Sequence, residues 1–152
     1  MRIGLISDTH GLLRPQALER LRNTACILHA GDVGDEAVLR ALQLLAPVHA
    51  VRGNNDHGPW ADALPPALTL AFGGYKVHLL HDLKALAPDR AAQGVRVVVS
   101  GHSHKPLVQE REGVLHVNPG SAGPRRFSLP VTVGLLFLES TGPRAEILPL
   151  LA

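Results

Sequence analysis

The chain of 152 residues contains one cysteine, few aromatic residues and no long apolar run. A lone thiol, Cys26, cannot form an internal disulfide, which is typical of a protein from a reducing compartment. No apolar stretch reaches the roughly 20 residues that a membrane-spanning helix requires, and the N-terminal residues show no signal-peptide pattern. The sequence therefore predicts a cytoplasmic protein without a membrane segment.

The chain also has little excess of charge of either sign. Its formal net charge is +2, and its basic residues are scattered, with Arg125-Arg126 as the one adjacent pair. Nucleic-acid binding is therefore not indicated. Because aromatic residues make up only 3%, the core must consist of Leu, Val, Ile and Ala. The length suffices for one domain, which we expect to cover residues 1–152.

The first third of the chain alternates strand and helix patterns. Strands are expected at about 2–7, 25–29 and 48–52. One helix should begin at Pro15 and span PQALERLRN, and a second should follow the N-cap residue Asp35 and span EAVLRALQLLA. This βαβαβ order predicts a parallel sheet that is covered by helices.

The remainder of the chain reads mainly as hairpins after a loop at 53–66 that is rich in Gly, Asn and Pro. Turns at Gly73-Gly74 and Glu112-Gly113 predict two of them, and a short helical piece is expected around 86–93. The expected strands are LTLAF, YKVHLLH, residues 95–99, 107–111 and 113–117, VTVGLLFLE and AEILPL. The fold class is thus an α/β sandwich with a parallel first half and a hairpin-rich second half.

Five of the apolar runs are each followed by side chains that can hold a metal ion. These side chains are Asp8, His10, Asp32, Asn54, His81, His102 and His104. Ligands collect beyond the carboxyl ends of strands in sheets of this kind, so these side chains should converge on one rim. Carboxylates mixed with neutral imidazoles suit Mn, Fe, Co, Ni or Zn better than Ca or Mg. Two such ions held together are a device for hydrolysing phosphate esters.

Small residues precede three of these side chains. Gly31, Gly53 and Gly101 each stand before a candidate ligand, where they would let the backbone turn sharply and approach a ligand closely. Each motif alone is weak, because D-x-H recurs by chance and G-D and G-N are ordinary turn formers. All of them in this order, each behind a strand, form a specific composite that core packing does not predict.

The motifs D-x-H, G-D, G-N-x-D, H and G-H-x-H, in this order, resemble those of the calcineurin-like metallophosphoesterase superfamily. Similarity to its small bacterial phosphodiesterase branch covers nearly the whole chain and is carried by SDTHG at 7–11, LHAGD at 28–32, RGNND at 52–56, SGHSHKP at 100–106 and NPGS at 118–121. The resemblance implies a four-layer αββα sandwich, with two mixed β-sheets face to face and helices on the outside.

The resemblance also implies how two metal ions would be held. The first set of ligands is Asp8, His10, Asp32 and His104, and the second is Asp32, Asn54, His81 and His102, with Asp32 bridging. Manganese is the favoured ion, with Ni, Co, Fe or Zn as alternatives. A hydroxide bridging the two ions would attack phosphorus in line with the leaving group of a small-molecule phosphate ester.

Two positions depart from the family pattern: Asn55, and Asp82, which stands after His81 where Gly is frequent. Many members carry a His after the Asn of the G-N motif, where it protonates the leaving group, and here that residue is Asn55. His57 is the nearest imidazole that could replace it, although a surface loop residue is the favoured reading. The expected catalytic set is therefore Asp32, Asn54, Asn55 and His57. Asp82 either orients a ligand imidazole or, as favoured here, is a solvated loop carboxylate.

Other polar residues leave alternatives open. We expect neutral core or sheet residues at His29, His49, His78 and His116, and turn residues near the site at Asn118 and Ser121. Arg125 either contacts phosphate or forms a surface salt bridge. Trp60 either walls the substrate cleft or caps an edge of the core.

The leading functional hypothesis is a metal-dependent phosphoesterase, most simply a phosphodiesterase. One alternative is an interaction scaffold on the same fold, similar to the metallophosphoesterase-like subunit of retromer. Such a scaffold typically lacks a metal ligand, whereas all seven positions are filled here. The other alternative is a phosphomonoesterase. The sequence leaves a homo-oligomer open.

Overall fold

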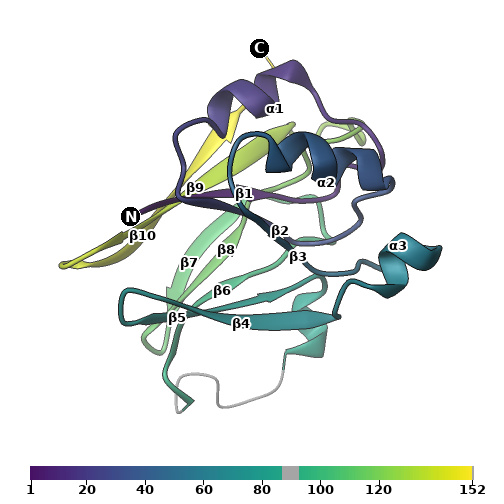
Figure 1. Cartoon of the computed structure of the whole chain (residues 1–152). Coiled ribbons are helices and arrows are strands. Elements are labelled where there is room, and N and C mark those ends of the chain that lie inside the picture. Colours follow the sequence, from purple (N-terminus) through teal and green to yellow (C-terminus); the bar gives the residue numbers. More distant parts are fainter. Residues whose placement is uncertain (87–92, 152) are drawn as a thin grey trace.

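Two five-stranded sheets dominate the computed structural model, which describes residues 1–86 and 93–151. The first sheet has the order β10-β9-β1-β2-β3 (Figure 1). Its strands are β1 (Arg2–Ile6), β2 (Cys26–His29), β3 (Val48–Ala50), β9 (Thr132–Glu139) and β10 (Gly142–Pro149). The first three are parallel, as the βαβαβ pattern predicts, and β9 and β10 add an antiparallel hairpin at the β1 edge.

The second sheet has the order β4-β5-β6-β8-β7. Its strands are β4 (Ala67–Phe72), β5 (Tyr75–Leu80), β6 (Val95–Val99), β7 (Leu107–Arg111) and β8 (Val114–Asn118). The three central strands are parallel, and a hairpin closes each edge. The predicted turns are both present: Gly73-Gly74 and Glu112-Gly113 have positive φ at both residues, as tight hairpins require.

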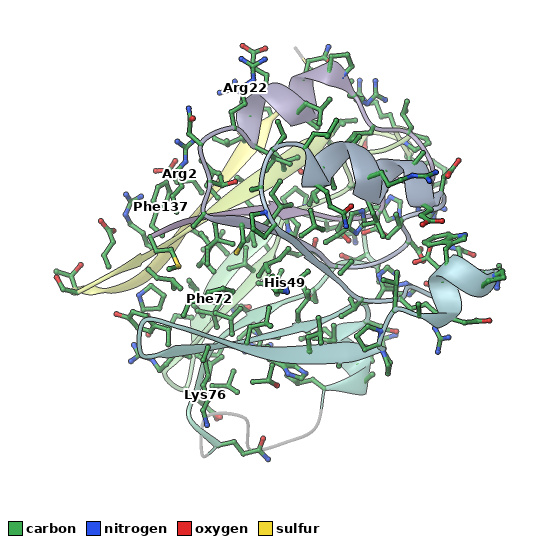
Figure 2. All side chains as sticks on the ribbon, in the orientation of Figure 1. Arg2, Arg22, His49, Phe72, Lys76 and Phe137 are labelled. Carbon is green, nitrogen blue, oxygen red and sulfur yellow. The ribbon has the colours of Figure 1, made fainter. Side chains whose placement is uncertain are left out.

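The main core lies between the facing sheets. Residues two apart on one strand point the same way, so Ile3 and Leu5 of β1 meet Val77 and Leu79 of β5 across the sandwich. At the edge, the ring of His49 on β3 contacts that of Phe72 on β4, with the ring centroids 6.4 Å apart (Figure 2). Aliphatic side chains thus fill the interior, as the scarcity of aromatic residues predicts.

Helices α1 (Pro15–Arg20) and α2 (Glu36–Gln43) cover the outer face of the first sheet (Figure 1). Leu21 and Leu42 pack there against the outward residues of the sheet. The predicted N-cap forms, because the Asp35 carboxylate accepts a hydrogen bond of 2.9 Å from the Ala37 N–H. Among the described helices, none is long and apolar enough to cross a membrane.

The four-layer prediction is confirmed, with a thin outer layer on the second sheet. In the described residues this layer is the 3₁₀ turn η1 (Leu83–Ala85), beside which Leu83 and Leu86 pack onto outward residues such as Val98. The helical piece predicted around 86–93 lies mostly outside the described residues. The loop predicted at 53–66 contains a short helix, α3 (Pro59–Asp62), whose single turn is too short to show a helical period in the sequence.

Both long helices are shorter than the apolar patterns predict. Helix α1 ends at Arg20 and α2 at Gln43, although the patterns continue to Asn23 and Ala46. The last residues of each pattern still pack against the sheet, but from turns. These positions are apolar because they are buried, and a buried position can lie in a turn as well as in a helix, so the pattern does not mark where the helix ends.

Candidate active site

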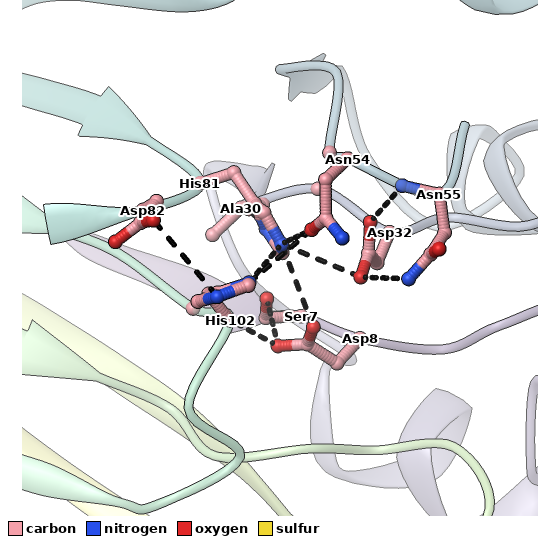
Figure 3. A network of polar contacts seen from close by, with 12 residues as sticks. Ser7, Asp8, Ala30, Asp32, Asn54, Asn55, His81, Asp82 and His102 are labelled. Atoms are coloured by element: carbon pink, nitrogen blue, oxygen red, sulfur yellow. Dashed lines mark hydrogen bonds and ion pairs between the residues drawn. The ribbon is translucent and has the colours of Figure 1, made fainter. Parts of the chain in front are cut away.

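The structure brings all seven predicted ligand side chains together at one rim of the sandwich. They follow β1, β2 and β3 of the first sheet and β5 and β6 of the second, whose carboxyl ends meet there. The loops from both sheets therefore form the site jointly, and Figure 3 shows the part of it around Asp8, Asp32, His81 and His102. The donor atoms fall into two groups.

The first group joins residues after β1, β2 and β6. The Nε2 atoms of His10 and His104 are 3.4 Å apart. Asp8 Oδ1 lies 3.4 Å from His104 Nε2 and 3.9 Å from His10 Nε2. Asp32 Oδ2 completes the group at 3.7 Å from His10 Nε2.

The second group lies on the other side of Asp32. His81 Nε2 is 2.9 Å from Asn54 Oδ1 and 3.4 Å from Asp32 Oδ2 (Figure 3). His102 Nδ1 is 3.2 Å from Asn54 Oδ1 and 3.3 Å from His81 Nε2. Asp32 Oδ2 thus borders both groups. Asp8 Oδ1 also comes within 3.9 Å of His81 Nε2, so both carboxylates sit near the middle.

These separations fit donors arranged around metal ions. Two ligands about 2.1 Å from one ion and about 110° apart are separated by about 3.4 Å. Asp8 supplies an independent test. Its Oδ2 accepts hydrogen bonds from the Ser7 hydroxyl (2.7 Å) and from the backbone N–H of His102 (3.0 Å). Its buried Oδ1 accepts no hydrogen bond from the described residues. A buried carboxylate oxygen without a partner is costly, and a cation would satisfy it.

The orientation of His81 is fixed by its backbone contact. Its Nδ1 lies 2.7 Å from the carbonyl oxygen of Ala30, to which it donates a hydrogen bond. Nε2 then faces Asp32 and Asn54, and in the neutral imidazole its lone pair would bind a cation placed there. Gly31 preserves this arrangement, because a Cβ there would lie 2.8 Å from His81 Nδ1.

Backbone strain is concentrated at the candidate ligands. Among the described non-glycine residues, eight have a positive φ, and five of these are predicted ligands. The five are Asp8 (54°), His10 (47°), Asp32 (54°), His102 (70°) and His104 (63°). Such conformations are uncommon for residues with a Cβ and persist where the surrounding structure enforces them, often at functional sites.

The backbone turns at the glycines before the ligands, as predicted: the Asp56 N–H donates to the Gly53 carbonyl (3.2 Å) and the Ser103 N–H to the Gly101 carbonyl (2.8 Å). Only Gly31 has a positive φ, so the turns at Gly53 and Gly101 do not use the left-handed conformation that favours glycine. The predicted close approach of the backbone to neighbouring groups is present at both Gly53 and Gly101. A Cβ at Gly53 would collide with the Asp32 carboxylate, and one at Gly101 would collide with the Ser7 hydroxyl. Absence of a side chain, not backbone freedom, selects glycine at these two positions.

The buried surroundings shift the ionisation of the site. Burial raises the pKa of the Asp8 carboxyl. Burial also acts to raise the pKa of Asp32, but hydrogen bonds with His81 and Asn55 outweigh it and hold that pKa below its ordinary range. For His81, burial is outweighed by the hydrogen bond to Asp32, and the pKa is raised. Burial lowers the pKa of His104. Two buried carboxylates among imidazoles form a site that a cation stabilises.

Asp56 is a residue of the site that the sequence interpretation missed. Its buried carboxylate accepts hydrogen bonds from the backbone N–H groups of Val33 (3.2 Å), Gly34 (2.9 Å) and Gly53 (2.8 Å). It thereby ties the loop after β2 to the loop after β3. The signal was present as the last residue of G-N-x-D, but its backbone partners are invisible in the sequence.

The NPGS segment supports the ligand loops from the other side. Ser121 Oγ donates a hydrogen bond of 3.0 Å to the backbone carbonyl of Asp8. Asn118 Nδ2 donates one of 3.0 Å to the carbonyl of Gly101. Both residues lie beside the site, as predicted, and both fix the backbone that carries candidate ligands.

Asn55 is exposed and hydrogen-bonds Asp32 through both its backbone and its side chain. Its backbone N–H donates to Asp32 Oδ1 (2.9 Å), and its side-chain Nδ2 donates to Asp32 Oδ2 (3.1 Å) (Figure 3). His57 is exposed on the loop before α3. The structure therefore gives Asn55 a role in orienting the carboxylate that borders both groups.

The remaining alternatives are partly resolved. Asp82 caps η1, because its Oδ1 accepts a hydrogen bond of 3.0 Å from the Lys84 N–H, and its Oδ2 lies 3.9 Å from His102 Nε2. Because this contact is long, the structure favours the interpretation of Asp82 as a loop carboxylate over a role in orienting a ligand imidazole. Trp60 is partly buried against the core beneath the helices, which favours the core edge. His29 is a neutral core residue, as expected: burial lowers its pKa to about 3.

Comparisons with known proteins agree with this geometry. Residues 1–141 match the calcineurin-like phosphoesterase superfamily domain. The chain is 34% identical to a probable metallophosphoesterase of Methanothermobacter thermautotrophicus, covering 97% of this chain and 92% of the relative. It is 26% identical to a phosphodiesterase of Methanocaldococcus jannaschii, covering 97% and 99% of the two chains. The chain belongs to the calcineurin-like phosphoesterase superfamily, and it is a metal-dependent phosphoesterase.

Solved structures show the same fold. An archaeal phosphodiesterase superimposes with a TM-score of 0.80 at 26% identity, covering 97% of this chain and 100% of that one. Zinc-bound Vps29 of Entamoeba histolytica gives a TM-score of 0.74 at 25% identity, covering 99% and 100%. The narrower resemblance to a bacterial branch is not borne out, because these relatives are archaeal or Vps29-like. Motifs imposed by metal chemistry are shared across branches and cannot separate them.

Replacement of Asp32 tests its position between the two donor groups. Asp32→Ala should lose metal from both groups and all measurable turnover, because it removes a donor from each. Metal content and hydrolysis of bis-p-nitrophenyl phosphate measure the two effects. Asp62→Ala is the matched control, since Asp62 forms only an exposed ion pair with Arg52. Normal metal content and rate in Asp32→Ala would refute the assignment.

Replacement of Asp56 tests the tie between the two loops. Asp56→Asn keeps the shape but brings N–H donors toward three backbone donors, so at least one buried N–H loses its acceptor. We expect the free energy of unfolding to fall by about 1–3 kcal/mol and metal affinity to weaken by about 10–100-fold. Urea denaturation and metal titration provide the measurements, with Asp62→Asn as control. Unchanged values for both quantities would contradict this role.

Proposed function

We propose that this protein hydrolyses small-molecule phosphodiesters with the help of two divalent transition-metal ions. Manganese is the favoured metal for both. Nickel, cobalt, iron and zinc suit the same mixed donors. The observation that carries the proposal is the Asp32 carboxylate, whose Oδ2 lies within 3.7 Å of His10 Nε2 and 3.4 Å of His81 Nε2. A carboxylate that lies between two sets of donors can bridge a pair of metal ions.

We assign the ligands as the family resemblance suggests. One ion would be held by Asp8, His10, Asp32 and His104, and the other by Asp32, Asn54, His81 and His102. Asp32 is preferred to Asp8 as the bridge because two hydrogen bonds from Asn55 orient its carboxylate between the groups. When bound, the ions would withdraw charge from the phosphate and lower the pKa of a nearby water.

The protein's own residues position the substrate and limit water. The side chains of Asp8 and Asp32 are almost fully covered, whereas those of His10 and His102 are 20% and 44% exposed. The substrate should therefore approach over these two histidines. Asn54 and Asn55 lie at the same side and can donate amide hydrogen bonds to phosphate oxygens or hold the carboxylate.

Preference for a diester is supported by two features. Asn55 hydrogen-bonds to Asp32 where many members of the family carry the acid that protonates a leaving group. A diester also carries one negative charge fewer than a monoester, which matches a site whose carboxylates already neutralise part of the ionic charge. A phosphodiesterase of Methanocaldococcus jannaschii is among the relatives.

The scaffold hypothesis rests on likeness to Vps29 structures at 25% identity. The donor set argues against it here, because all seven side chains point into two compact groups and a buried carboxylate oxygen still lacks a partner in the described chain. A protein that only binds partners gains nothing from such strain and burial.

We also propose a cytoplasmic location. The single thiol, Cys26, is buried between the sheets, and burial raises its pKa. It is therefore protected from oxidation and has no partner for a disulfide within the chain.

Metal reconstitution is the direct test of the proposed function. Protein stripped with a chelator and reconstituted should bind two ions per chain and should hydrolyse bis-p-nitrophenyl phosphate best with Mn²⁺, Ni²⁺ or Co²⁺. Elemental analysis and the release of p-nitrophenolate measure both. A protein that binds no metal and hydrolyses no phosphate ester would be a scaffold. Faster hydrolysis of p-nitrophenyl phosphate than of the diester would make it a phosphomonoesterase.

The absence of a leaving-group acid predicts a strong dependence on the leaving group. General acid catalysis contributes about 10²–10⁴-fold and matters most for poor leaving groups. We therefore expect p-nitrophenyl diesters to react much faster than alkyl diesters of similar size. His57→Gln should change both rates little and equally, since His57 is an exposed loop residue. Selective slowing of the alkyl ester in His57→Gln would identify His57 as the acid.

A further inference from the structure

A basic and apolar loop borders the candidate active site on the side of His10 and His104. We name residues 124–128, the sequence Pro-Arg-Arg-Phe-Ser, the rim loop. Its start is fixed against the loop after β1: Arg14 Nη2 donates a hydrogen bond of 3.2 Å to the Gly123 carbonyl. A Cβ at Gly123 would collide with the Thr9 carbonyl, so the two loops touch.

Phe127, on this loop, has an unusual environment. Its side chain is 96% exposed, the highest value among the large apolar residues of the described chain. Its φ is 51°, in the left-handed region that bulky residues rarely adopt. The chain contains only three phenylalanines. An aromatic ring held in water by a strained backbone gains nothing in folding, which points to a function in binding.

Basic residues lie on the rim loop and next to the candidate ligand His104. Arg125 and Arg126 precede Phe127 on the rim loop, and Lys105 follows His104; all three are exposed. No described carboxylate forms an ion pair with any of them. The rim loop begins three residues after Ser121, whose hydroxyl donates a hydrogen bond to the Asp8 carbonyl, so these arginines follow a segment that is fixed at the site.

The other end of the site is different. There Asp82 lies 3.9 Å from His102 Nε2, so the side of the second donor group carries an exposed carboxylate and not a basic cluster. A substrate with one anionic arm would therefore place that arm over the rim loop. The net charge of +2 spread over the chain provides no long basic track, so the substrate should be short.

We propose that the rim loop binds the arm of the diester that stays on phosphorus, with Phe127 stacking on a planar base and Arg126 pairing with a second phosphate. The substrate class is then a short nucleotide-type phosphodiester. Stacking of bases on aromatic side chains and pairing of phosphate with a guanidinium are the contacts that recognise such a molecule. This inference rests on the proposed function of the neighbouring site.

Three p-nitrophenyl diesters with the same scissile bond test the two contacts separately. They are methyl p-nitrophenyl phosphate, the p-nitrophenyl ester of thymidine 5′-phosphate, and the same ester with a 3′-phosphate. In the wild-type protein, we expect kcat/KM to rise by about tenfold when the base is added and to rise again with the 3′-phosphate.

Each variant should remove one step of this series. In Phe127→Ala, the ratio of kcat/KM between the thymidyl and methyl esters should fall to near one. In Arg126→Gln, the gain from the 3′-phosphate should disappear while the gain from the base remains. The matched controls are Leu44→Ala, which changes an exposed apolar side chain at the end of α2, and Arg22→Gln, which changes an exposed arginine just after α1 (Arg22 is labelled in Figure 2). Both controls should keep wild-type ratios.

Wild-type-like ratios in both variants would overturn the inference, as would loss of the 3′-phosphate effect in Arg125→Gln instead of Arg126→Gln. Hydrolysis of the methyl ester, which has no arm to contact the loop, reports on the proposed function alone. If no ester is hydrolysed, calorimetric binding of thymidine 3′,5′-bisphosphate by the metal-loaded protein still decides. Affinity about tenfold weaker in Phe127→Ala would support the rim loop, and equal affinity would refute it.

Discussion

The rest of this structure depends on two buried carboxylates that lie close together among four imidazoles. Asp8 and Asp32 are almost completely buried, and both approach His10 and His81. Burying two like charges is unfavourable unless positive charge compensates them. Imidazoles can do so in part by binding protons, but Asp8 Oδ1 accepts no hydrogen bond from the residues that the structure describes. The arrangement is therefore built for cations, and the fold must hold it in place against the repulsion of its own ligands.

That support comes mainly from backbone contacts between loops of different strands. The carboxylate of Asp56 accepts three backbone N–H groups from two loops, and Ser121 holds the carbonyl of Asp8. Gly53 and Gly101 lack the Cβ that would displace the neighbouring ligand loop. The left-handed conformations of the ligand residues are maintained by this crosslinking. The strained backbone of the ligand residues therefore depends on the hydrogen bonds that connect the loops.

The order of the ligands and the strands before them could be predicted from the sequence, because both depend on local patterns. Apolar runs predict β1, β2 and β6, and the polar residue after each run predicts which side chains meet. Contacts between distant loops have no local pattern. The acceptor role of Asp56 and the hydrogen bonds from Asn55 to Asp32 depend on how the β2 and β3 loops lie in space. Helix α3 was missed because a single turn shows no helical period, and no local pattern indicates that Phe127 is exposed.

Asn55 connects the chemistry of the site with the rim loop. A histidine at this position could donate a proton to a leaving group, whereas Asn55 uses its amide to orient the carboxylate between the donor groups. The site thereby gives up assistance that poor leaving groups need. Binding energy from a remote part of the substrate can compensate, provided that it positions the phosphorus for attack. The rim loop, with an exposed aromatic ring and two arginines that pair with no described carboxylate, is suited to supply such energy. On the proposed function, the site lacks a leaving-group acid, and such an enzyme depends more strongly on contacts with the arm of the substrate that stays on phosphorus.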